Sequence, residues 1–144
     1  MNSMLKAQVG QICFVRMNEN DDLLETIKKS AEEGGIKAGM FMLIGALKNV
    51  VLACYENGEY KYTRLREPVE IASCMGNIAV DEKGEVIIHA HLVVSNNKGE
   101  AFGGHLIKDS HVGPTAELVI IEAANVNLQR AFDEKTKLKL LKLG

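Results

Sequence analysis

Residues 85–107 read EVIIHAHLVVSNNKGEAFGGHLI, two apolar runs joined by a short polar segment. Apolar side chains alternate with histidines in the first run, which is the two-residue period of a β-strand with one buried face. Residues 97–99 fit a three-residue hairpin turn, in which Gly99 supplies the left-handed last position. The segment therefore predicts two antiparallel strands in which Asn96 pairs with Glu100. The face expected in the core is Ile88, Ala90, Leu92 and Val94.

Three of the four histidines converge in this register. His89 and His91 lie two residues apart and so share one face, and the turn brings His91 opposite His105 and His89 opposite Ile107. Gly103, opposite Val93, leaves space beside them, although a β-bulge at Gly103-Gly104 would shift the register. Three neutral imidazoles without a thiolate suit Zn²⁺ or a similar divalent metal and leave a fourth position open for water.

We therefore predict a metal site made of His89, His91 and His105, with His91 the most sensitive ligand because it lies beside both of the others. The alternative is three histidines that hydrogen-bond within a sheet face or a subunit interface. His111 follows the second strand of the hairpin and is expected to be an exposed loop residue outside the site.

The rest of the chain predicts one helix and many strands. Asp22, followed three residues later by Glu25, resembles a capping box, and Gly34-Gly35 marks the helix end. The buried helical face is expected to be Leu24, Ile27 and Ala31. The expected strands are residues 11–17, 39–47, 49–55, 60–65, 69–80, 85–95, 100–108, 116–123 and 137–143. This pattern predicts an α+β fold, a mainly antiparallel β-sheet with one principal helix, in a single domain over residues 1–144.

Composition narrows the class of protein. The 144 residues carry a formal charge of −2, and they are 47% apolar and 25% charged, which is typical of a globular domain and excludes a disordered chain. The near-neutral charge and the 5% aromatic content argue against a dedicated nucleic-acid binder. The longest apolar run, residues 40–47, is far shorter than the roughly 20 residues of a membrane-spanning helix.

The cysteines and the N-terminus indicate a cytoplasmic protein. Cys13, Cys54 and Cys74 are odd in number and lie far apart in apolar runs, which is typical of reduced, buried core thiols. Residues 1–10 contain no apolar stretch of the kind found in a signal peptide. Ile87 and Val93 flank the histidines, so the hairpin is apolar on both faces, which favours an oligomer.

The hairpin resembles the "plants and prokaryotes conserved" (PPC) domain family. The most specific matches are Ile88-His-Ala-His-Leu92, Asn96-Asn-Lys-Gly99 and Gly103-Gly-His-Leu106. Further matches follow in chain order, with Val69 replacing an aromatic residue: Arg16, the helix at 24–35, Ile44-Gly-Ala-Leu47, Pro68-Val-Glu-Ile71, Ser73-Cys-Met-Gly76, Pro114-Thr-Ala-Glu117, Arg130 and Asp133-Glu134. The resemblance implies an antiparallel domain that forms a homotrimer and holds a metal at the three histidines.

The resemblance also bears on DNA. Plant members of the family carry an AT-hook that grips the minor groove, but this chain has no Arg-Gly-Arg-Pro motif and is similar to the stand-alone prokaryotic members. We therefore rank a trimeric metal-binding domain, with zinc as the expected metal and an unidentified small-molecule ligand, above a weakly DNA-associated protein. A metalloenzyme, a lyase or hydrolase acting on a small carbonyl compound, ranks third. In that case Arg16, Glu70 and Glu117 are the candidates for acid, base or anion-binding groups, although each is equally typical of an ion-paired sheet residue.

Overall fold

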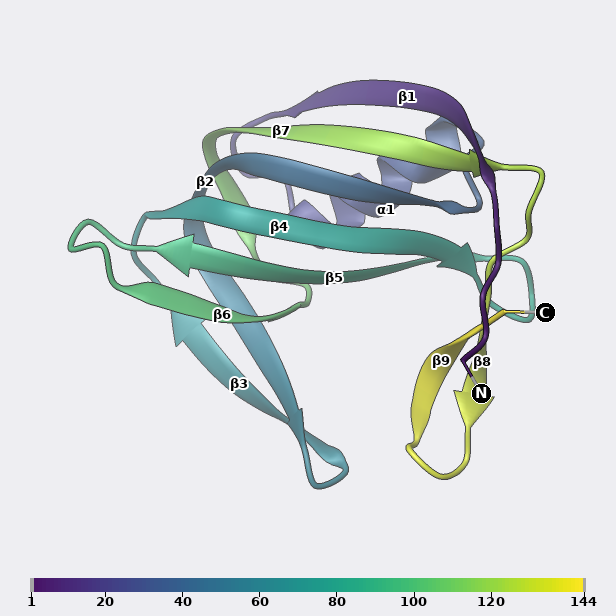
Figure 1. Ribbon diagram of the computed structural model, residues 1–144. Coiled ribbons are helices and arrows are strands. Elements are labelled where there is room, and N and C mark those ends of the chain that lie inside the picture. The colour runs from purple at the N-terminus through teal and green to yellow at the C-terminus, as the bar shows by residue number, and fades with distance from the viewer. Residues whose placement is uncertain (1, 144) are drawn as a thin grey trace.

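A single curved sheet and one helix make up the part of the chain that the computed structural model describes, residues 2–143 (Figure 1). The helix is α1 (Leu23–Glu33). The strands are β1 (Gln8–Met17), β2 (Gly39–Glu56), β3 (Glu59–Leu65), β4 (Val69–Val80), β5 (Val86–Ser95), β6 (Ala101–Leu106), β7 (His111–Ala124), β8 (Gln129–Asp133) and β9 (Leu138–Lys142). The predicted α+β class, a mainly antiparallel sheet with one helix, is confirmed.

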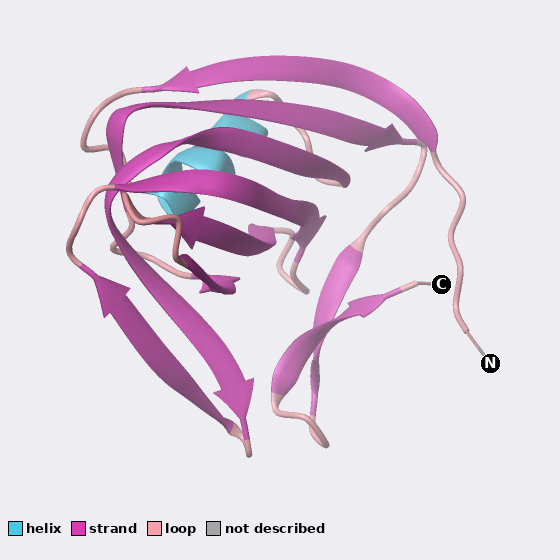
Figure 2. Cartoon of the chain, turned by 60° about the vertical axis from the view of Figure 1, so that its left-hand side comes forward, coloured by secondary structure: helices cyan, strands magenta, loops and turns pink. Residues whose placement is uncertain are grey.

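The sheet closes on itself through β2. The strand order is β1-β7-β2-β6-β5-β4-β8-β9, with β3 paired to β2, and β2 also pairs with β4. The first half of β2 pairs with β4 and β7, whereas its second half pairs with β3 and, at Leu52 and Ala53, with β6. The circuit β2-β4-β5-β6 therefore encloses the interior, and α1 lies against the inner side of the curved sheet (Figure 2).

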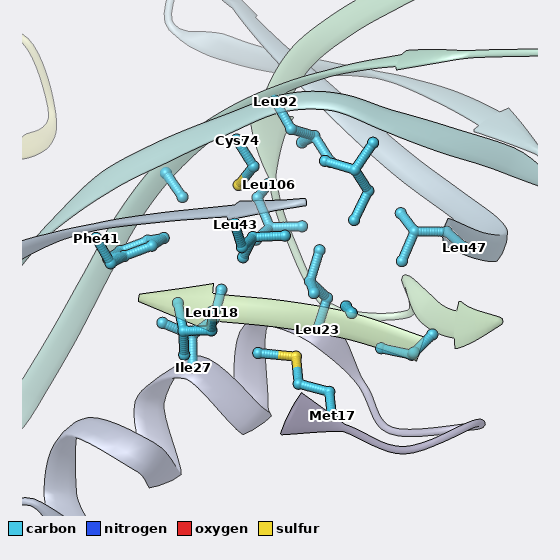
Figure 3. Close-up of a cluster of buried hydrophobic side chains, with 14 of the residues drawn as sticks. Met17, Leu23, Ile27, Phe41, Leu43, Leu47, Cys74, Leu92, Leu106 and Leu118 are labelled. Carbon is cyan, nitrogen blue, oxygen red and sulfur yellow. The ribbon is translucent and has the colours of Figure 1, made fainter. Parts of the chain in front are cut away.

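The core lies between the helix and the inner face of the sheet. Side chains from α1, β2, β4, β5, β6 and β7 converge there, among them Ile27, Phe41, Cys74, Leu92, Leu106 and Leu118 (Figure 3). The Asp22 carboxylate accepts a hydrogen bond from the Glu25 N–H at 3.0 Å, so Asp22 is the N-cap, as predicted. Glu25 does not complete a capping box and pairs with Lys108 at 2.8 Å.

Two predicted details of the core were wrong. Leu23 is the fully buried residue of the first helical turn, and the predicted Leu24 is half-buried at its edge. Cys74 is buried as expected, but Cys13 is half-buried and Cys54 is exposed, because Cys54 lies where β2 extends past the core to pair with β3.

β2 is one strand of 18 residues, not the two strands predicted on either side of Lys48. The chain bends instead of breaking, because the pairing register with β7 shifts between Gly45 and Asn49 while the strand exchanges partners. Gly45 has a φ of 144°, and an added β-carbon would lie 2.5 Å from the α-carbon of Ala116.

β7 begins at His111, five residues before the predicted start. The predicted start at Ala116 left Pro114 outside the strand. Proline cannot donate a hydrogen bond to a neighbouring strand. β1 pairs with β7 as far as the Met17–Ala116 pair, and the next backbone hydrogen bonds join Val112 to Asn20 and Asp21, so Pro114 lies between these two sets of bonds.

Two hairpins extend from the sheet toward each other, β2–β3 and β8–β9 (Figure 2). Strand β8 was not predicted, whereas β9 was. Between residues 2 and 143, the one strand pairing that joins β8–β9 to the rest of the sheet is a parallel bridge between Val80 and Gln129. The Tyr55 hydroxyl on β2 donates to the Thr136 carbonyl and so connects the two hairpins. Among the described residues, no helix combines the length and apolar character that crossing a membrane requires.

Candidate metal centre

The hairpin β5–β6 has the predicted register. His91 pairs with His105 and Val93 with Gly103, without a bulge at Gly103-Gly104. The Asn96 N–H donates to the Glu100 carbonyl at 3.1 Å, and Gly99 has a φ of 74°. The turn chemistry therefore fixed which side chains share the outer face of β5.

The three histidines form a nearly equilateral triangle. Ring centroids are 5.0 Å apart for His89–His91, 5.1 Å for His89–His105 and 5.3 Å for His91–His105. One ring nitrogen from each lies within 4.8 Å of the others. This set is called the histidine cluster below. Because the three centroid distances are nearly equal, His91 is no closer to the other two rings than His89 or His105 is.

One detail of the predicted register was wrong. His89 does not lie opposite Ile107, because β6 ends at Leu106 after it has turned to pair with β2. His89 lies instead opposite Asn77 of β4.

Arg130 of β8 contacts the histidine cluster. Its Nη2 lies 3.0 Å from His89 Nδ1 and donates to Asn77 Oδ1 at 2.8 Å, while Nη1 donates to the Lys139 carbonyl at 3.0 Å. The side chain is only 7% exposed, and its buried Nε has no hydrogen-bond partner. Arg130 therefore fastens the β8–β9 hairpin to the outer face of β5.

The β2–β3 hairpin also contacts the histidine cluster. The Tyr60 ring of β3 lies 5.7 Å from the His105 ring, and Tyr60 in turn packs against Tyr55 at 5.3 Å. The histidine cluster thus receives neighbours from β3, β4 and β8 in addition to its own hairpin.

The surroundings favour the neutral forms of His89 and His105. Burial lowers the pKa of His89 to about 4, with further contributions from the positive charges of Arg130, His105 and His91. Burial likewise lowers the pKa of His105, and His91 and Arg130 add to the effect. Because only a neutral imidazole offers a lone pair, these shifts reduce the competition of protons with a metal ion.

The geometry fits a divalent metal. Zn²⁺ bonds imidazole nitrogen at about 2.0–2.1 Å, so a tetrahedral ion holds its nitrogens roughly 3.4 Å apart. The nitrogens of the histidine cluster lie within 4.8 Å of one another, so each pair would have to close by at most about 1.4 Å to reach this spacing. His89, His91 and His105 would be the ligands, and the solvent-facing side would remain free for a fourth.

A hollow of about 410 Å³ adjoins the cluster on the His91 side. Gly103, which shares the outer face with His105, lines it together with Gly104, Met75 and Val93.

The other candidate residues lie elsewhere. Arg16 and Glu117 pair across β1 and β7 and line a separate hollow of about 650 Å³. Glu70 lies on β4 opposite Ser95, five residues from the Met75–His91 pair. None of the three makes a hydrogen bond or ion pair with the histidine cluster in the described part of the chain.

His111 is outside the histidine cluster, as predicted, but it is not a loop residue. It is the first residue of β7, is half-buried, and its Nδ1 lies 3.1 Å from Asn49 Oδ1. Its partner Asn49 also donates to the Asp109 carbonyl at 2.6 Å, so His111 helps to order the β6–β7 connection.

Comparison with known proteins agrees with this fold. The model of the Plants and Prokaryotes Conserved (PCC) domain, the family abbreviated PPC above, matches residues 4–124. The metal-containing protein AF0104 from Archaeoglobus fulgidus is 31% identical, with a TM-score of 0.88 over 96% of this chain and 98% of that one. A plant- and prokaryote-conserved protein from Pyrococcus horikoshii is 28% identical, with a TM-score of 0.87 over 98% and 99%.

Two further similarities point to other contexts. A candidate DNA-binding protein from Ralstonia eutropha JMP134 is 26% identical, with a TM-score of 0.80 over 91% of this chain and 90% of that one. The bifunctional protein GlmU of a Synechococcus strain is 26% identical over 124 residues, which is 85% of this chain but only 18% of that protein. The chain thus spans less than a fifth of the curated relatives it matches. The family match, by contrast, covers most of the sheet and the whole histidine hairpin, and the chain belongs to the Plants and Prokaryotes Conserved domain family.

Proposed function

We propose that this protein is a homotrimeric metal-binding domain that holds zinc at His89, His91 and His105. The observation that carries the proposal is the triangle of three imidazoles, with centroids 5.0–5.3 Å apart and nitrogens within 4.8 Å. Such a donor set, nitrogen without thiolate, is typical of zinc sites that keep one position for an exchangeable ligand. The similar protein from Archaeoglobus fulgidus is described as metal-containing, which supports the proposal.

The experiment is metal analysis of purified protein after zinc loading and dialysis. We expect roughly one zinc ion per chain in the wild type. In His89→Ala, His91→Ala and His105→Ala the zinc affinity should fall by more than about 100-fold. Loss of a residue that only hydrogen-bonds a metal ligand already lowers metal affinity by about 10–100-fold, and loss of the ligand itself should cost more. His111→Ala is the matched control and should keep its zinc. Full zinc content in the three cluster variants would refute the site.

The proposal of a trimer is supported by an outer apolar surface. It is made of Ile12, Phe14, Met40, Met42, Ile44 and Met75. These side chains come from β1, β2 and β4, with β7 between β1 and β2 in the sheet, and Phe14 is 81% exposed. Exposed apolar surfaces of this extent mark protein–protein contacts. The surface reaches the histidine cluster at Met75, which pairs with His91, so association would also cover one side of the metal site.

Light scattering tests the trimer. We expect three times the chain mass of 15.8 kDa for the wild type and a smaller mass for Ile44→Lys, because a lysine ammonium would be buried in the contact. Tyr62→Lys on β3 is the control, since Tyr62 and Ile44 are 57% and 59% exposed but only Ile44 lies on the outer apolar surface. A monomeric wild type at micromolar concentration would contradict the proposal.

Duplex DNA is a second candidate partner, favoured by the likeness to the Ralstonia protein. The net charge of −2 opposes strong phosphate binding. We infer weak, sequence-independent association, with a dissociation constant in the range of roughly 10⁻⁴ to 10⁻⁶ M at physiological salt. A sequence-selective complex at nanomolar protein would contradict this.

A metalloenzyme acting on a small carbonyl compound stays the third candidate. A metal at the histidine cluster would supply Lewis acidity. Arg16, Glu70 and Glu117 make no contact with the histidine cluster, so the acid or base for such chemistry would have to come from the bound molecule or from elsewhere.

We also propose a cytoplasmic location. The three cysteines are free, and Cys54 is exposed. Exposed free thiols persist in reducing compartments. Thiol labelling of protein taken directly from cells should modify Cys54, and a protein that arrives with Cys54 already oxidised would contradict the location.

A further inference from the structure

Arg130 brings an uncompensated positive charge to the histidine cluster. The three groups it contacts, Asn77, His89 and the Lys139 carbonyl, are all neutral. Among the described residues no carboxylate forms an ion pair with it. At 7% exposure a guanidinium without a counter-charge is costly, and its Nε lacks even a hydrogen-bond acceptor.

Arg130 and a metal compete for the same lone pair. A neutral imidazole has one ring N–H and one ring nitrogen with a free lone pair. In His89 the lone pair is on Nδ1, because Nδ1 accepts the hydrogen bond from Arg130 Nη2. A metal at Nδ1 would replace the arginine directly. A metal at Nε2 would move the ring proton to Nδ1. The Nδ1–H and the Arg130 Nη2–H would then point at each other, and neither group could accept a hydrogen bond. In either case, metal binding by His89 breaks the Arg130–His89 hydrogen bond.

Release from His89 would leave one edge of the guanidinium short of acceptors. Nε and Nη2 form that edge of the planar group. Nε has no partner already, and Nη2 would retain only Asn77. Two parallel N–H groups on one edge match the two oxygens of a carboxylate or a phosphate. With three neutral imidazoles, a divalent ion and Arg130 would together carry three positive charges in one partly buried site.

We propose that the metal-loaded histidine cluster binds a small oxyanion, a carboxylate or phosphate group, between the metal and the Nε–Nη2 edge of Arg130. The inference rests on the proposed function and names the class of its ligand. Arg130 matches the family pattern in sequence, but it lies in β8, beyond the residues 4–124 that the family model matches, and neither match assigns it a role.

The experiment measures anion binding by calorimetry at constant ionic strength. Acetate and methyl phosphate represent the two sources of the oxyanion, and chloride is the control ion. We expect at least one of the two to bind zinc-loaded wild type about tenfold or more tightly than it binds zinc-free protein, and Arg130→Gln to remove most of this gain. Arg66→Gln, an exposed arginine in the β3–β4 connection, is the matched control and should change nothing.

Zinc affinity without added anion gives a readout that a purely structural arginine would not produce. Because a competitor and a nearby charge are removed, Arg130→Gln should bind zinc at least as tightly as the wild type. Arg130→Lys keeps the charge but loses the two-pronged edge, and should bind the anion more weakly than the wild type. If neither variant folds, the ¹⁵N signal of Arg130 Nε in the wild type should shift on zinc addition and again on anion addition.

The outcomes are separable. Wild type that binds zinc but prefers neither anion, or an anion preference that survives in Arg130→Gln, would overturn the inference and leave the metal site standing. Zinc affinity lost in Arg130→Gln as fully as in His89→Ala would overturn the competition. Absence of zinc binding in the wild type would end the proposed function itself.

Discussion

The two faces of β5 arise from the same alternation of side chains, but different interactions stabilise the side chains on each face. The inner face, Ala90, Leu92 and Val94, packs in the core, where burial of apolar surface stabilises the fold without regard to direction. The outer face carries His89 and His91, whose contacts come from Asn77 on β4, His105 on β6 and Arg130 on β8. An apolar face needs only to be covered, whereas a polar face needs specific partners that the fold must deliver from distant parts of the chain.

The largest effect should come from the inner face. Leu92→Ala removes a side chain that is 2% exposed, and we expect the free energy of unfolding to fall by about 3 kcal/mol. His91→Ala, measured without metal, should cost less than about 1 kcal/mol, because the exposed outer position leaves the core intact. Denaturant unfolding of both at one protein concentration checks the contrast, and equal losses would erase the distinction between the faces.

A smaller, pH-dependent effect belongs to the outer face. His89 has an ordinary pKa near 6.5 in the unfolded chain but about 4 in the fold, because it is buried beside Arg130. Between pH 6.5 and 4, His89 is protonated in the unfolded chain but neutral in the folded one. The stabilising contribution of His89 to metal-free protein is therefore fully present above pH 6.5 and is lost as the pH falls toward 4.

His89→Gln isolates this contribution. The variant has no imidazole to titrate at this position, so it should lose less stability than the wild type between pH 7.5 and 5. Parallel losses in denaturant titrations at the two pH values would show that His89 does not titrate as the structure implies.

The smallest effect concerns the turn that sets the register of both faces. Gly99→Ala places a β-carbon at a φ of 74°, where nothing lies within 4 Å, so the cost should be backbone strain alone, about 1 kcal/mol. Zinc affinity should stay within about twofold, since the His91–His105 pair is also held by the strands. The exposed Asn97→Ala in the same turn is the control, and a large loss of zinc in Gly99→Ala would mean that the turn alone holds the register.

The contrast between the faces also explains how far the sequence could be interpreted. The histidine hairpin was predictable because alternation and Gly99 are local signals, and together they brought His91 to His105 across 14 residues. The helix was predictable from its cap at Asp22, and Ile27 and Ala31 are buried as predicted, although Leu23 takes the buried position predicted for Leu24.

The neighbours of the histidine cluster were not predictable in the same way. Arg130 matched a family pattern, but nothing in a five-residue strand indicated that it would reach His89, 41 residues away. Tyr60 reaches His105 only because β2 continues past the core and carries β3 with it, and the expected break at Lys48 concealed that extension. Partner exchange within one strand leaves little local trace, since each half looks like an ordinary strand.

The pairing of β1 with β7 governs the order in which this protein can fold. Met17 pairs with Ala116, so β1 pairs with a strand that emerges from the ribosome about a hundred residues later. At a synthesis rate of roughly 5–20 residues per second, the backbone edge of β1 stays unpaired for several seconds. Contacts this distant in sequence also slow folding, toward the millisecond-to-second range of β-rich domains. Nascent chains of this protein therefore carry an unpaired β1 edge until β7 has emerged.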